Sequence, residues 1–323
     1  MTDALLEIRG LKKYFPYRGG RFLSGERGMI RAVDGVDLEI LRGETLGLVG
    51  ESGCGKTTLG RLVMRLEEPT AGEIRFEGED ILTRKGAALK GYRRMVQMIF
   101  QDPYSSLNPR KTAGGIIGEP LRIHHPRWGD RAKGRMAELM AVVGLDGEQM
   151  SRYPHQFSGG QRQRIGIARA LILNPRLIVA DEPVSALDVS IQAQILNLMK
   201  TLQQNLALTY LLITHDLGVV RHMSDRIAVM YLGKIVELGT GEAVCERPAH
   251  PYTRALISAV PVVDPRGRKR RTILAGEMPS PGNPPPGCAF HPHCPIRTGL
   301  CESQEPRLLQ SGPGHRVACH RAV

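Results

Sequence analysis

The sequence lacks the features of a secreted or membrane-spanning chain. Its first ten residues, MTDALLEIRG, have no basic segment followed by an apolar one, as a secretion signal would. No stretch approaches the roughly 18 consecutive apolar residues that a spanning helix needs. Six cysteines in 323 residues, without a secretion signal, argue against a disulfide scaffold and leave free thiols, metal ligands or redox groups. We therefore expect a cytoplasmic chain.

No internal repeat is apparent either, which favours one main domain with a smaller appendage over a tandem pair. The content of 41% hydrophobic and 24% charged residues is typical of a globular protein that can bury a large core. The formal net charge of +12 is compatible with nucleic acid, an acidic membrane surface or a polyanionic ligand. Charge alone does not choose among these partners.

The apolar patterning predicts an α/β domain. Short apolar segments predict strands, some of them buried and parallel, and a long amphipathic segment predicts a helix. The predicted strands lie at residues 5–15, 36–40, 45–50, 176–181 and 209–214, and the helix at 190–204. Glycines and charges from Pro16 to Ile30 predict a surface loop. From about Val260 onward, proline, glycine and the run GRKRR near Arg268 predict a linker and irregular structure.

Residues Gly50 to Thr57, GESGCGKT, match the phosphate-loop pattern G-x-x-x-x-G-K-[ST] between a predicted strand and a predicted helix. Glycines let backbone N–H groups turn toward phosphate oxygens, and the helix N-terminus adds a positive dipole. Lys56 would then reach the β- and γ-phosphates, and the Thr57 hydroxyl would bind Mg²⁺. A glycine-rich turn that binds nothing would have no need of Lys followed by Thr.

An apolar strand, Leu177 to Asp181, ends in a carboxylate and is followed by Glu182. At the carboxyl edge of the sheet, Asp181 would hold Mg²⁺ through water. Glu182 would polarise an attacking water, since in-line attack on the γ-phosphate needs such a group. An Asp-Glu pair by itself is usually a solvated strand end, but the phosphate loop favours the catalytic interpretation.

The segment FSGGQRQR, from Phe157 to Arg164, resembles the signature of the ABC ATPase family, LSGGQ, with Phe157 in place of leucine. Its serine and glycines expose N–H groups at a helix start, which serves as a second anion site or as a simple cap. In the family, the signature of one subunit closes on ATP held by the other subunit in a head-to-tail dimer. The resemblance therefore implies that four residues act in trans: Ser158, Gly159, Gly160 and Gln161.

The resemblance implies roles for further residues, which occur along the chain in the same order as in the family. Gln101 is similar to the glutamine that senses Mg²⁺ and the attacking water, and His215 to the histidine that contacts the γ-phosphate. Asp188 lies in a segment similar to the dimer-contact loop. Tyr14 is similar to the aromatic residue that stacks on adenine, with core packing as the alternative. The implied ATP contacts of the loop are Gly50, Glu51, Ser52, Gly53, Cys54, Gly55, Lys56, Thr57 and Thr58, and the implied Mg²⁺ ligands are Thr57, Gln101 and Asp181.

Two further segments resemble the ATPases of bacterial dipeptide and oligopeptide importers: FQDPYSSLNPR at 100–110 and YPHQ at 153–156. The part after Gln101 corresponds to the place where that family docks coupling helices of its membrane partners. The similar tail contains HPYT at 250–253 and then Cys288, Cys294, Cys301 and Cys319. Four thiolates suit either Zn²⁺ or an iron–sulfur cluster, and resemblance to members with a [4Fe–4S] centre favours the cluster. Substitute ligands would be His291, His293, His315 or His320, and unligated cysteines are the remaining alternative.

The fold that the resemblance implies is α/β: a P-loop NTPase (RecA-like) core with an N-terminal antiparallel β subdomain, an inserted helical subdomain at about 102–164, and a small Cys-rich irregular C-terminal extension. The ATP-binding domain would cover 1–262 and the extension 263–323. Cys54 and the isolated Cys245 are expected to be small packing residues.

The function that the resemblance implies is ATP hydrolysis coupled to import of short peptides. The expected partners are a second, related ABC ATPase subunit, two transmembrane permease subunits and an extracytoplasmic peptide-binding protein, with no nucleic acid. The expected location is the cytoplasmic face of the bacterial inner membrane. One alternative is another cargo, such as nickel, glutathione or a sugar. A second is an ABC ATPase acting on nucleic acid or ribosomes, which the positive charge mildly favours. A binding module without catalysis is discounted by Glu182 and His215.

Overall fold

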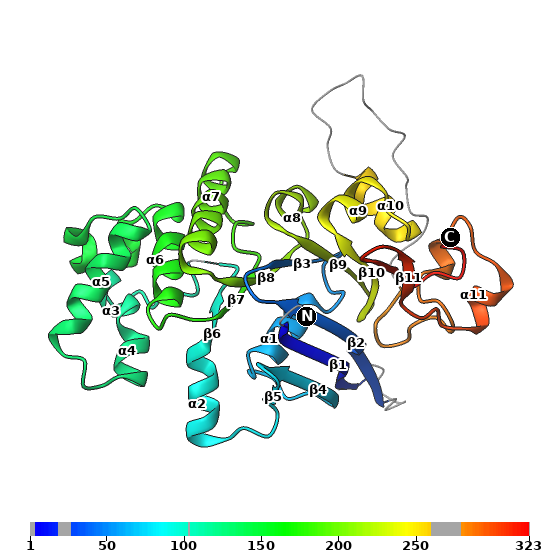
Figure 1. Ribbon diagram of the computed structural model, residues 1–323, viewed down its shortest axis with the longest axis horizontal. Coiled ribbons are helices and arrows are strands. Elements are labelled where there is room, and N and C mark those ends of the chain that lie inside the picture. Colours follow the sequence, from blue (N-terminus) through cyan, green and yellow to red (C-terminus); the bar gives the residue numbers. More distant parts are fainter. Residues whose placement is uncertain (1–3, 19–26, 103, 260–278, 323) are drawn as a thin grey trace. The chain divides into compact units, whose positions relative to one another are not determined.

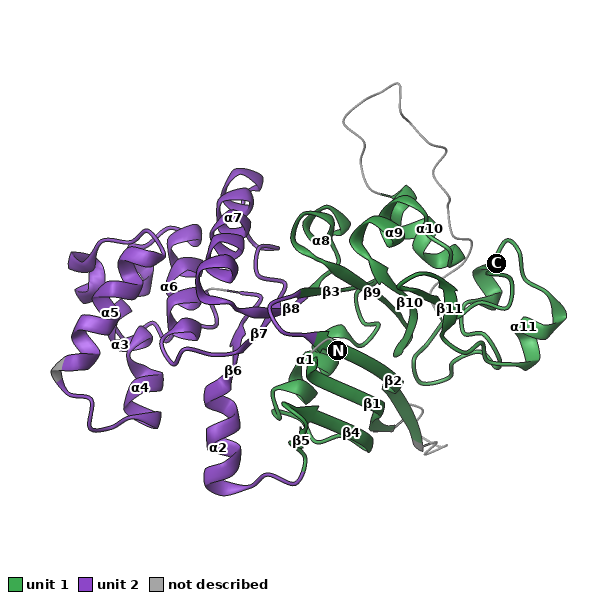
Figure 2. Cartoon of the chain, in the orientation of Figure 1, with its two compact units in different colours: residues 1–40, 45–82, 213–323 green, residues 41–44, 83–212 purple. Residues whose placement is uncertain are grey.

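A computed structural model describes residues 4–18, 27–102, 104–259 and 279–322. They form two compact units, coloured separately in Figure 2: residues 1–40, 45–82 and 213–323, and residues 41–44 and 83–212. The chain passes from the second unit into the first within strand β8 (Thr209–Thr214). Within the described ranges, no helix is long and apolar enough to cross a membrane.

The first unit contains a small antiparallel sheet with the strand order β2-β1-β4-β5 (Figure 1). Its strands are β1 (Ala4–Arg18), β2 (Arg27–Leu41), β4 (Ala71–Phe76) and β5 (Glu79–Asp80). Leu6 pairs with Phe76 and Ile8 with Ile74 across β1 and β4, and all four side chains are buried. One face of this sheet therefore covers a core, as expected for the N-terminal β subdomain.

The first unit also contains five strands of a larger sheet, which follow one another in the order β11-β12-β10-β9-β3. These strands are β3 (Thr45–Val49), β9 (Arg226–Tyr231), β10 (Lys234–Thr240), β11 (Leu309–Gly312) and β12 (His315–Val317). β3 runs parallel to β9, and all five of its residues are buried. A continuous apolar run of this kind is typical of a strand that is covered on both faces.

One apolar core in the first unit joins the end of β3 to three helices and to the C-terminal segment. Val49, Val220, Val244, Tyr252 and Phe290 all belong to it. The helices of this unit are α1 (Lys56–Val63), α8 (Leu217–Met223), α9 (Gly241–Glu246), α10 (Pro251–Ser258) and α11 (Gly299–Ser303), with a 3₁₀ turn η4 (His291–His293). The region predicted to bind phosphate and the cysteine-rich tail thus share one core.

The second unit combines three strands in the order β8-β7-β6 with helices. β6 (Val96–Ile99) and β7 (Leu177–Asp181) run parallel, and every residue of β7 is buried. The α-helices are α2 (Gly86–Met95), α3 (Ala113–Ile117), α4 (Glu119–His124), α5 (Asp130–Val142), α6 (Gly159–Leu171) and α7 (Val189–Leu206), with 3₁₀ turns η1 (Gly147–Ser151) and η2 (Pro154–Gln156). The described part of the segment from Asp102 to Pro154 contains helices joined by turns and no strand, as predicted.

Two predictions of irregular structure were wrong in part. The expected loop from Pro16 to Ile30 is shorter, because β1 continues to Arg18 and β2 begins at Arg27. Gly28 lies against the Tyr17 ring, which a β-carbon there would approach to 2.4 Å, so this glycine serves close packing and not a turn. The expected irregular tail contains β11 and β12, which extend the sheet beyond β10. The GRKRR run lies outside the described residues.

Candidate functional site

The predicted phosphate loop connects β3 to α1 in the first unit. Gly53 and Gly55 have φ values of 82° and 111°, in the region that favours glycine. A β-carbon on Gly55 would lie 2.0 Å from the carbonyl oxygen of Ala32, so the loop excludes any side chain there. Helix α1 starts without a side-chain cap. Its N-terminus therefore keeps the polarity that favours an anion.

Lys56 is buried over this loop, with only 5% of its surface exposed. Its Nζ donates to the carbonyl oxygen of Gly50 at 2.7 Å and to that of Glu51 at 2.9 Å. Both acceptors are neutral, and a buried ammonium is better stabilised by an anion such as phosphate. Cys54 is 1% exposed, and burial raises the pKa of its thiol. It packs as a small core residue, as expected.

Tyr14, the predicted adenine contact, donates its hydroxyl hydrogen bond to Oδ1 of Asp34. Burial and this contact raise the pKa of Tyr14 to about 12. Asp34 also pairs with Lys234 at 3.0 Å, and the guanidinium of Arg31 lies 5.9 Å from the Tyr14 ring centroid. These contacts fix the ring in the first unit. Its stacking on adenine stays a prediction.

His215 lies just after β8, at the exposed start of α8. The neighbouring Asp216 caps that helix, because its Oδ1 accepts a hydrogen bond from the Gly218 N–H at 2.7 Å. The cap fixes the backbone where His215 leaves the strand. The predicted contact of His215 with the γ-phosphate stays a prediction.

Gln101 and Glu182 meet in the second unit. Because β6 and β7 are parallel, with Ile99 opposite Ala180, the residues that follow both strands emerge at one edge of the sheet. Nε2 of Gln101 donates to Oε2 of Glu182 at 2.8 Å. Asp181, the last residue of β7, is 4% exposed. The structure therefore brings together two side chains that lie 81 positions apart in the sequence.

Glu182 itself has a positive φ of 45°. Residues with a β-carbon rarely adopt this left-handed conformation, which costs on the order of 1–2 kcal/mol. Such strain concentrates at functional sites, where it aims a side chain at a particular point. No pattern in the sequence predicted this conformation.

The segment that resembles the ABC signature forms the start of α6. Ser158 Oγ accepts a hydrogen bond from the Gln161 N–H at 3.3 Å, and Gln161 Oε1 accepts one from the Ser158 N–H at 3.0 Å. A β-carbon on Gly160 would lie 2.6 Å from Ile191 of α7. Phe157 is 4% exposed and fills an apolar position. Ser158 is thus both a helix cap and an exposed residue at a helix N-terminus.

Exposed side chains lie in the two predicted contact segments. Asp188 is the N-cap residue of α7, and the next residue, Val189, is 81% exposed. Tyr104 is 61% exposed, and the guanidinium of Arg162 lies 3.9 Å from its ring centroid. Asp102 accepts a hydrogen bond from the Tyr104 N–H at 2.7 Å, which shapes the turn. Apolar surface of this kind is available to partners.

The four C-terminal cysteines lie close enough to influence one another. The pKa of Cys288 is raised to about 11, chiefly by burial and to a smaller extent by negative charge on the other three thiols, against a hydrogen bond from the Phe290 backbone that lowers it. The Cys288 N–H donates to the Cys301 carbonyl at 2.8 Å. Among the described residues, however, no three His, Cys, Asp or Glu side chains converge as metal ligands. Four sulfurs are the right donors for a cluster, and metal binding by these cysteines stays a prediction.

The predicted substitute ligands have other contacts. His315 Nε2 lies 2.7 Å from Glu237 Oε1, and His320 Nε2 lies 2.9 Å from the Gln304 carbonyl. His291 Nδ1 lies 3.0 Å from the Cys288 carbonyl. His293 has a buried Nε2 beside the Phe290 ring.

Comparison with known proteins agrees with this geometry. Residues 33–185 match the family model described as ABC transporter, and residues 236–301 match the one described as oligopeptide/dipeptide transporter, C-terminal region. The oligopeptide transport ATP-binding protein AppF of Bacillus subtilis is 54% identical over 321 residues, which cover 98% of this chain and 97% of that protein. This chain belongs to the ABC transporter ATP-binding proteins of the dipeptide/oligopeptide importer family.

Two other proteins extend the comparison. The dipeptide transport ATP-binding protein DppF of Escherichia coli is 51% identical to this ABC ATPase over 319 residues, with 99% of this chain and 95% of that protein covered. A solved dimeric ATP-binding cassette in a post-hydrolysis state, bound to ADP and phosphate, is 29% identical with a TM-score of 0.64. That match covers 73% of this ABC ATPase and 98% of the cassette.

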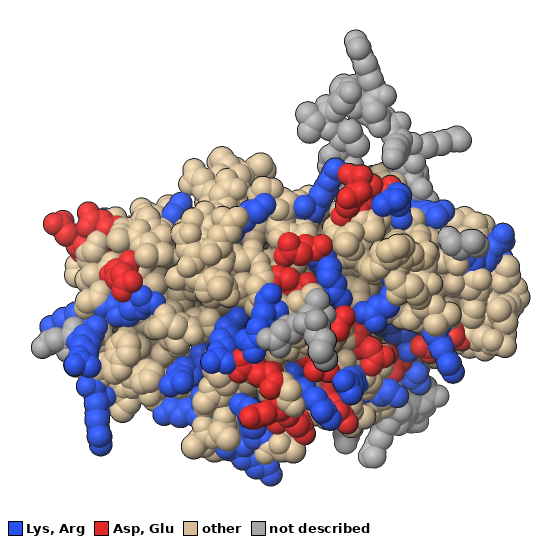
Figure 3. Space-filling view, viewed as in Figure 1, with Lys and Arg blue, Asp and Glu red and all other residues tan. Residues whose placement is uncertain are grey.

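The matched segments include most predicted site residues of this ABC ATPase. The first contains the loop, Gln101, the signature and the Asp181–Glu182 pair, and the second contains Cys288, Cys294 and Cys301. Four predicted residues lie outside both matched segments: Tyr14, Asp188, His215 and Cys319. On the face drawn in Figure 3, basic side chains are interspersed with acidic ones, unlike a continuous basic stripe for nucleic acid.

One residue that contacts the phosphate loop, Tyr252 of α10, was not predicted from the sequence. The Glu51 N–H donates to the Tyr252 hydroxyl at 2.9 Å, across 201 sequence positions. The HPYT segment that contains Tyr252 was recognised only as a mark of the peptide-importer subgroup. No spacing rule relates it to a phosphate loop, because the contact depends on how β3 and α10 share one core.

Proposed function

We propose that this ABC ATPase pairs head to tail with a related ATPase subunit and that the pair hydrolyses ATP to drive uptake of short peptides. The observation that carries the proposal is the Gln101–Glu182 hydrogen bond of 2.8 Å at the ends of β6 and β7. A phosphate loop alone indicates only nucleotide binding. A strained glutamate beside a glutamine adds the groups that position an attacking water.

Each predicted site residue has a proposed role in ATP binding or hydrolysis. Gly50 to Thr58 hold the phosphates by backbone N–H groups, and Lys56 exchanges neutral carbonyl acceptors for phosphate oxygens. Thr57, Gln101 and Asp181 would hold Mg²⁺, which when bound neutralises charge on the phosphates. Glu182 orients the attacking water and accepts its proton. His215 contacts the γ-phosphate, and Tyr14 stacks on adenine.

The experiment replaces Glu182 with Gln, which keeps the size of the side chain but removes the carboxylate. ATP should still bind, and hydrolysis in the assembled transporter should fall by about 10²–10⁴-fold, the usual contribution of a general base. Lys56→Ala is the companion variant, which should lose binding itself. A Glu182→Gln transporter that retains most of its turnover would refute the catalytic role.

The dimer is proposed to place Ser158, Gly159, Gly160 and Gln161 on the partner's nucleotide, with Asp188 at the contact between subunits. Support comes from the exposed start of α6 and from the similar cassette, which is dimeric with ADP and phosphate bound. Each subunit would then supply half of two sites. The proposed domains are residues 1–262 for ATP binding, with a helical part at about 102–164, and 263–323 for the extension.

The remaining partners are proposed from the family. They are two transmembrane permease subunits, docked on the segment after Gln101, and an extracytoplasmic peptide-binding protein, with this chain at the cytoplasmic face of the membrane. The exposed Tyr104 supports docking there. Nickel, glutathione or a sugar is the alternative cargo. An ATPase acting on nucleic acid is disfavoured by the match to the transporter C-terminal region.

Metal binding by Cys288, Cys294, Cys301 and Cys319 is also a proposal, with a [4Fe–4S] cluster favoured over Zn²⁺. Support comes from the four sulfur donors and from the Cys288 N–H that donates to the Cys301 carbonyl at 2.8 Å, because neighbouring thiolates repel one another and a bound cation would relieve that repulsion. No step of ATP hydrolysis is assigned to this group. Anaerobic purification with iron and zinc analysis tests it: iron supports the cluster, zinc supports the alternative, and neither metal refutes both.

A further inference from the structure

Three buried aromatic rings connect the phosphate loop to the cysteine segment within the first unit. The rings of Tyr231 and Tyr252 have centroids 4.7 Å apart, and the Phe290 ring lies 5.4 Å from Tyr231 and 5.6 Å from Tyr252. All three side chains are at most 2% exposed. Packed rings of this kind hold one another in fixed orientations.

Only Tyr252 of these rings has a described contact with the loop backbone. Its hydroxyl accepts the hydrogen bond from the Glu51 N–H at 2.9 Å. Glu51 is also the residue whose carbonyl accepts from Lys56 Nζ at 2.9 Å and from the Cys54 N–H at 3.3 Å. The Glu51 N–H shares its peptide with the Gly50 carbonyl, which also accepts from Lys56 Nζ at 2.7 Å, so Tyr252 fixes a peptide that holds the predicted phosphate-binding lysine.

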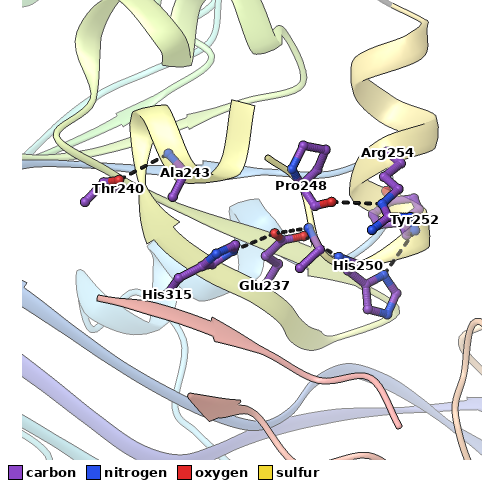
Figure 4. A network of polar contacts seen from close by, with 9 residues as sticks. Glu237, Thr240, Ala243, Pro248, His250, Tyr252, Arg254 and His315 are labelled. Atoms are coloured by element: carbon purple, nitrogen blue, oxygen red, sulfur yellow. Dashed lines mark hydrogen bonds and ion pairs between the residues drawn. The ribbon is translucent and has the colours of Figure 1, made fainter. Parts of the chain in front are cut away.

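The start of α10, which carries Tyr252, is held by a buried carboxylate (Figure 4). Glu237 has no exposed surface and accepts hydrogen bonds from the N–H groups of Ala249 and His250 at 2.8 and 2.9 Å. His250 Nδ1 in turn accepts from the Tyr252 N–H at 3.1 Å. The backbone of Tyr252 is thus held in place independently of its hydroxyl.

Tyr231 provides an internal contrast. It belongs to the same ring cluster and is equally buried, but within the described part of the chain its hydroxyl has no hydrogen-bond partner. Burial raises the pKa of Tyr231, and negative charge on the nearby Glu51 and Cys288 contributes to the same increase. The two tyrosines therefore share packing and differ in the contact with the loop.

Phe290 joins the cluster to the cysteines. It follows Cys288 by two residues and precedes Cys294 by four, and both of these cysteines pack against the same core. The His291 N–H donates to the Cys288 carbonyl at 2.9 Å, so the backbone at Phe290 follows any movement of Cys288. A change at the cysteines has a direct packing route to Tyr252.

We propose that Tyr252 is a positioning residue for the phosphate loop, and that the cysteine segment sets nucleotide affinity through Phe290 and Tyr252. The proposal rests on the proposed role of residues 50–57 as the phosphate site. It assigns the C-terminal segment a regulatory link to ATP binding. A structural change in the cysteine segment would shift the Tyr252 hydroxyl. The segment itself would not touch the nucleotide.

The test measures binding of a fluorescent ATP analogue with Mg²⁺ to the full chain. Tyr252→Phe keeps the ring and removes only the acceptor for the Glu51 N–H, so affinity should fall about three- to tenfold, as expected for one lost hydrogen bond. Amide hydrogen exchange of the peptide spanning residues 50–57 should become faster. Affinity equal to wild type, with unchanged exchange, would overturn the positioning role.

Tyr231→Phe is the matched control, since it removes a buried hydroxyl from the same cluster without removing a hydrogen bond to the loop. Its affinity and loop exchange should equal those of wild type. An equal loss in both variants would show that the cluster acts only through its packing and would overturn the specific role of Tyr252. Lys56→Ala separates the two proposals: if that variant binds nucleotide normally, the loop is not the phosphate site and the proposed function fails.

Phe290→Leu tests the link to the cysteine segment. It keeps an apolar side chain but loosens the packing on Tyr252, so affinity should fall in the same direction as in Tyr252→Phe. In the double variant the losses should not add, because both act on one hydroxyl. Fully additive losses, or no loss in Phe290→Leu, would overturn the route through Tyr252.

Discussion

At the scale of single residues, two positions of the predicted site have constrained backbone conformations. Glu182 has a positive φ of 45°, and Gly55 has φ 111° with no room for a β-carbon. The glycine could be predicted, because the phosphate-loop pattern includes it. The glutamate could not, since only the turn after β7 imposes its conformation. Strained positions of this kind couple the local backbone to function.

Gly55→Ala should be much more harmful than Gly53→Ala. Both positions have left-handed φ values, so each substitution costs about 1–2 kcal/mol of stability from backbone strain. At Gly55 the added β-carbon also lies 2.0 Å from the Ala32 carbonyl, whereas at Gly53 nothing lies within 4 Å. We expect a total loss of about 2–4 kcal/mol for Gly55→Ala, measured by urea unfolding. Equal losses in the two variants would contradict the close approach.

His250 should make stability depend on pH. Burial lowers its pKa from 6.5 to about 3, so it stays neutral in the folded chain. The unfolded chain binds this proton below about pH 6.5, and therefore the free energy of unfolding falls as the pH drops from about 6.5 toward 3, by up to about 1.4 kcal/mol per unit. Above about pH 6.5 the unfolded chain no longer binds this proton, so His250 no longer lowers the free energy of unfolding.

The variant His250→Asn isolates this contribution, because asparagine also caps a helix but does not titrate. Its unfolding free energy should be lower than that of wild type near neutral pH and should fall less steeply between about pH 6.5 and 4.5. The other histidines are common to both proteins and cancel in the difference. Parallel pH profiles would show that His250 is not kept neutral by folding.

At the scale of elements, the start of α6 combines two properties in one serine. Ser158 caps the helix through the Gln161 N–H, and it is exposed at the helix N-terminus, where the family places the partner's phosphate. The sequence predicted the helix start and a simple serine cap. The reciprocal hydrogen bond with Gln161, which makes this S-x-x-Q segment a capping box, was not predicted. The sequence could not separate capping from nucleotide binding.

Two substitutions at Ser158 separate these properties. Ser158→Ala should lower the stability of the chain by about 1 kcal/mol through loss of the cap. Ser158→Asp should keep the cap, because aspartate is an equally good N-cap residue, but its negative charge should repel phosphate and abolish hydrolysis in the assembled transporter. Thermal unfolding and ATPase assays distinguish them, and an active Ser158→Asp transporter would count against nucleotide contact in trans.

The buried strands of the fold could be predicted from the sequence, whereas two short strands at the edge could not. β7 and β8 were predicted from continuous apolar runs, and both are buried along their whole length. The short strands β11 and β12 were not, because QSG and HRV carry no apolar pattern of their own. They exist because β10 offers an edge, with Glu237 opposite Val317. Pairing with an existing sheet stabilises segments whose own sequence predicts no strand.

At the scale of the whole molecule, the sequence indicated candidate site residues, whose roles stay predictions, better than the residues that support them. Lys56, Gln101 and Glu182 were predicted from patterns and from family resemblance. Asp34, Glu237 and Tyr252 were not, although each fixes a group in or near the site. Tyr252 lies 201 positions from Glu51, Asp34 lies 20 from Tyr14 and Glu237 lies 13 from His250, and no sequence pattern relates the members of these pairs.

The partners provide a test at this scale. Affinity purification of the full chain from detergent-solubilised membranes should recover two permease subunits and an ATPase subunit in stoichiometric amounts. The basic side chains interspersed with acidic ones in Figure 3 lead us to expect no bound RNA or DNA. Nuclease-sensitive material in place of membrane partners would contradict peptide import and support the alternative on nucleic acid.

The Tyr252–Glu51 contact also has a consequence for how the protein is made. The two residues are separated by 201 positions, so the ribosome has synthesised most of the chain before the phosphate loop meets its aromatic support. Nascent chains that have passed residue 58 contain every loop residue but not the acceptor for the Glu51 N–H. A growing chain therefore acquires its final loop late, when α10 docks on the core.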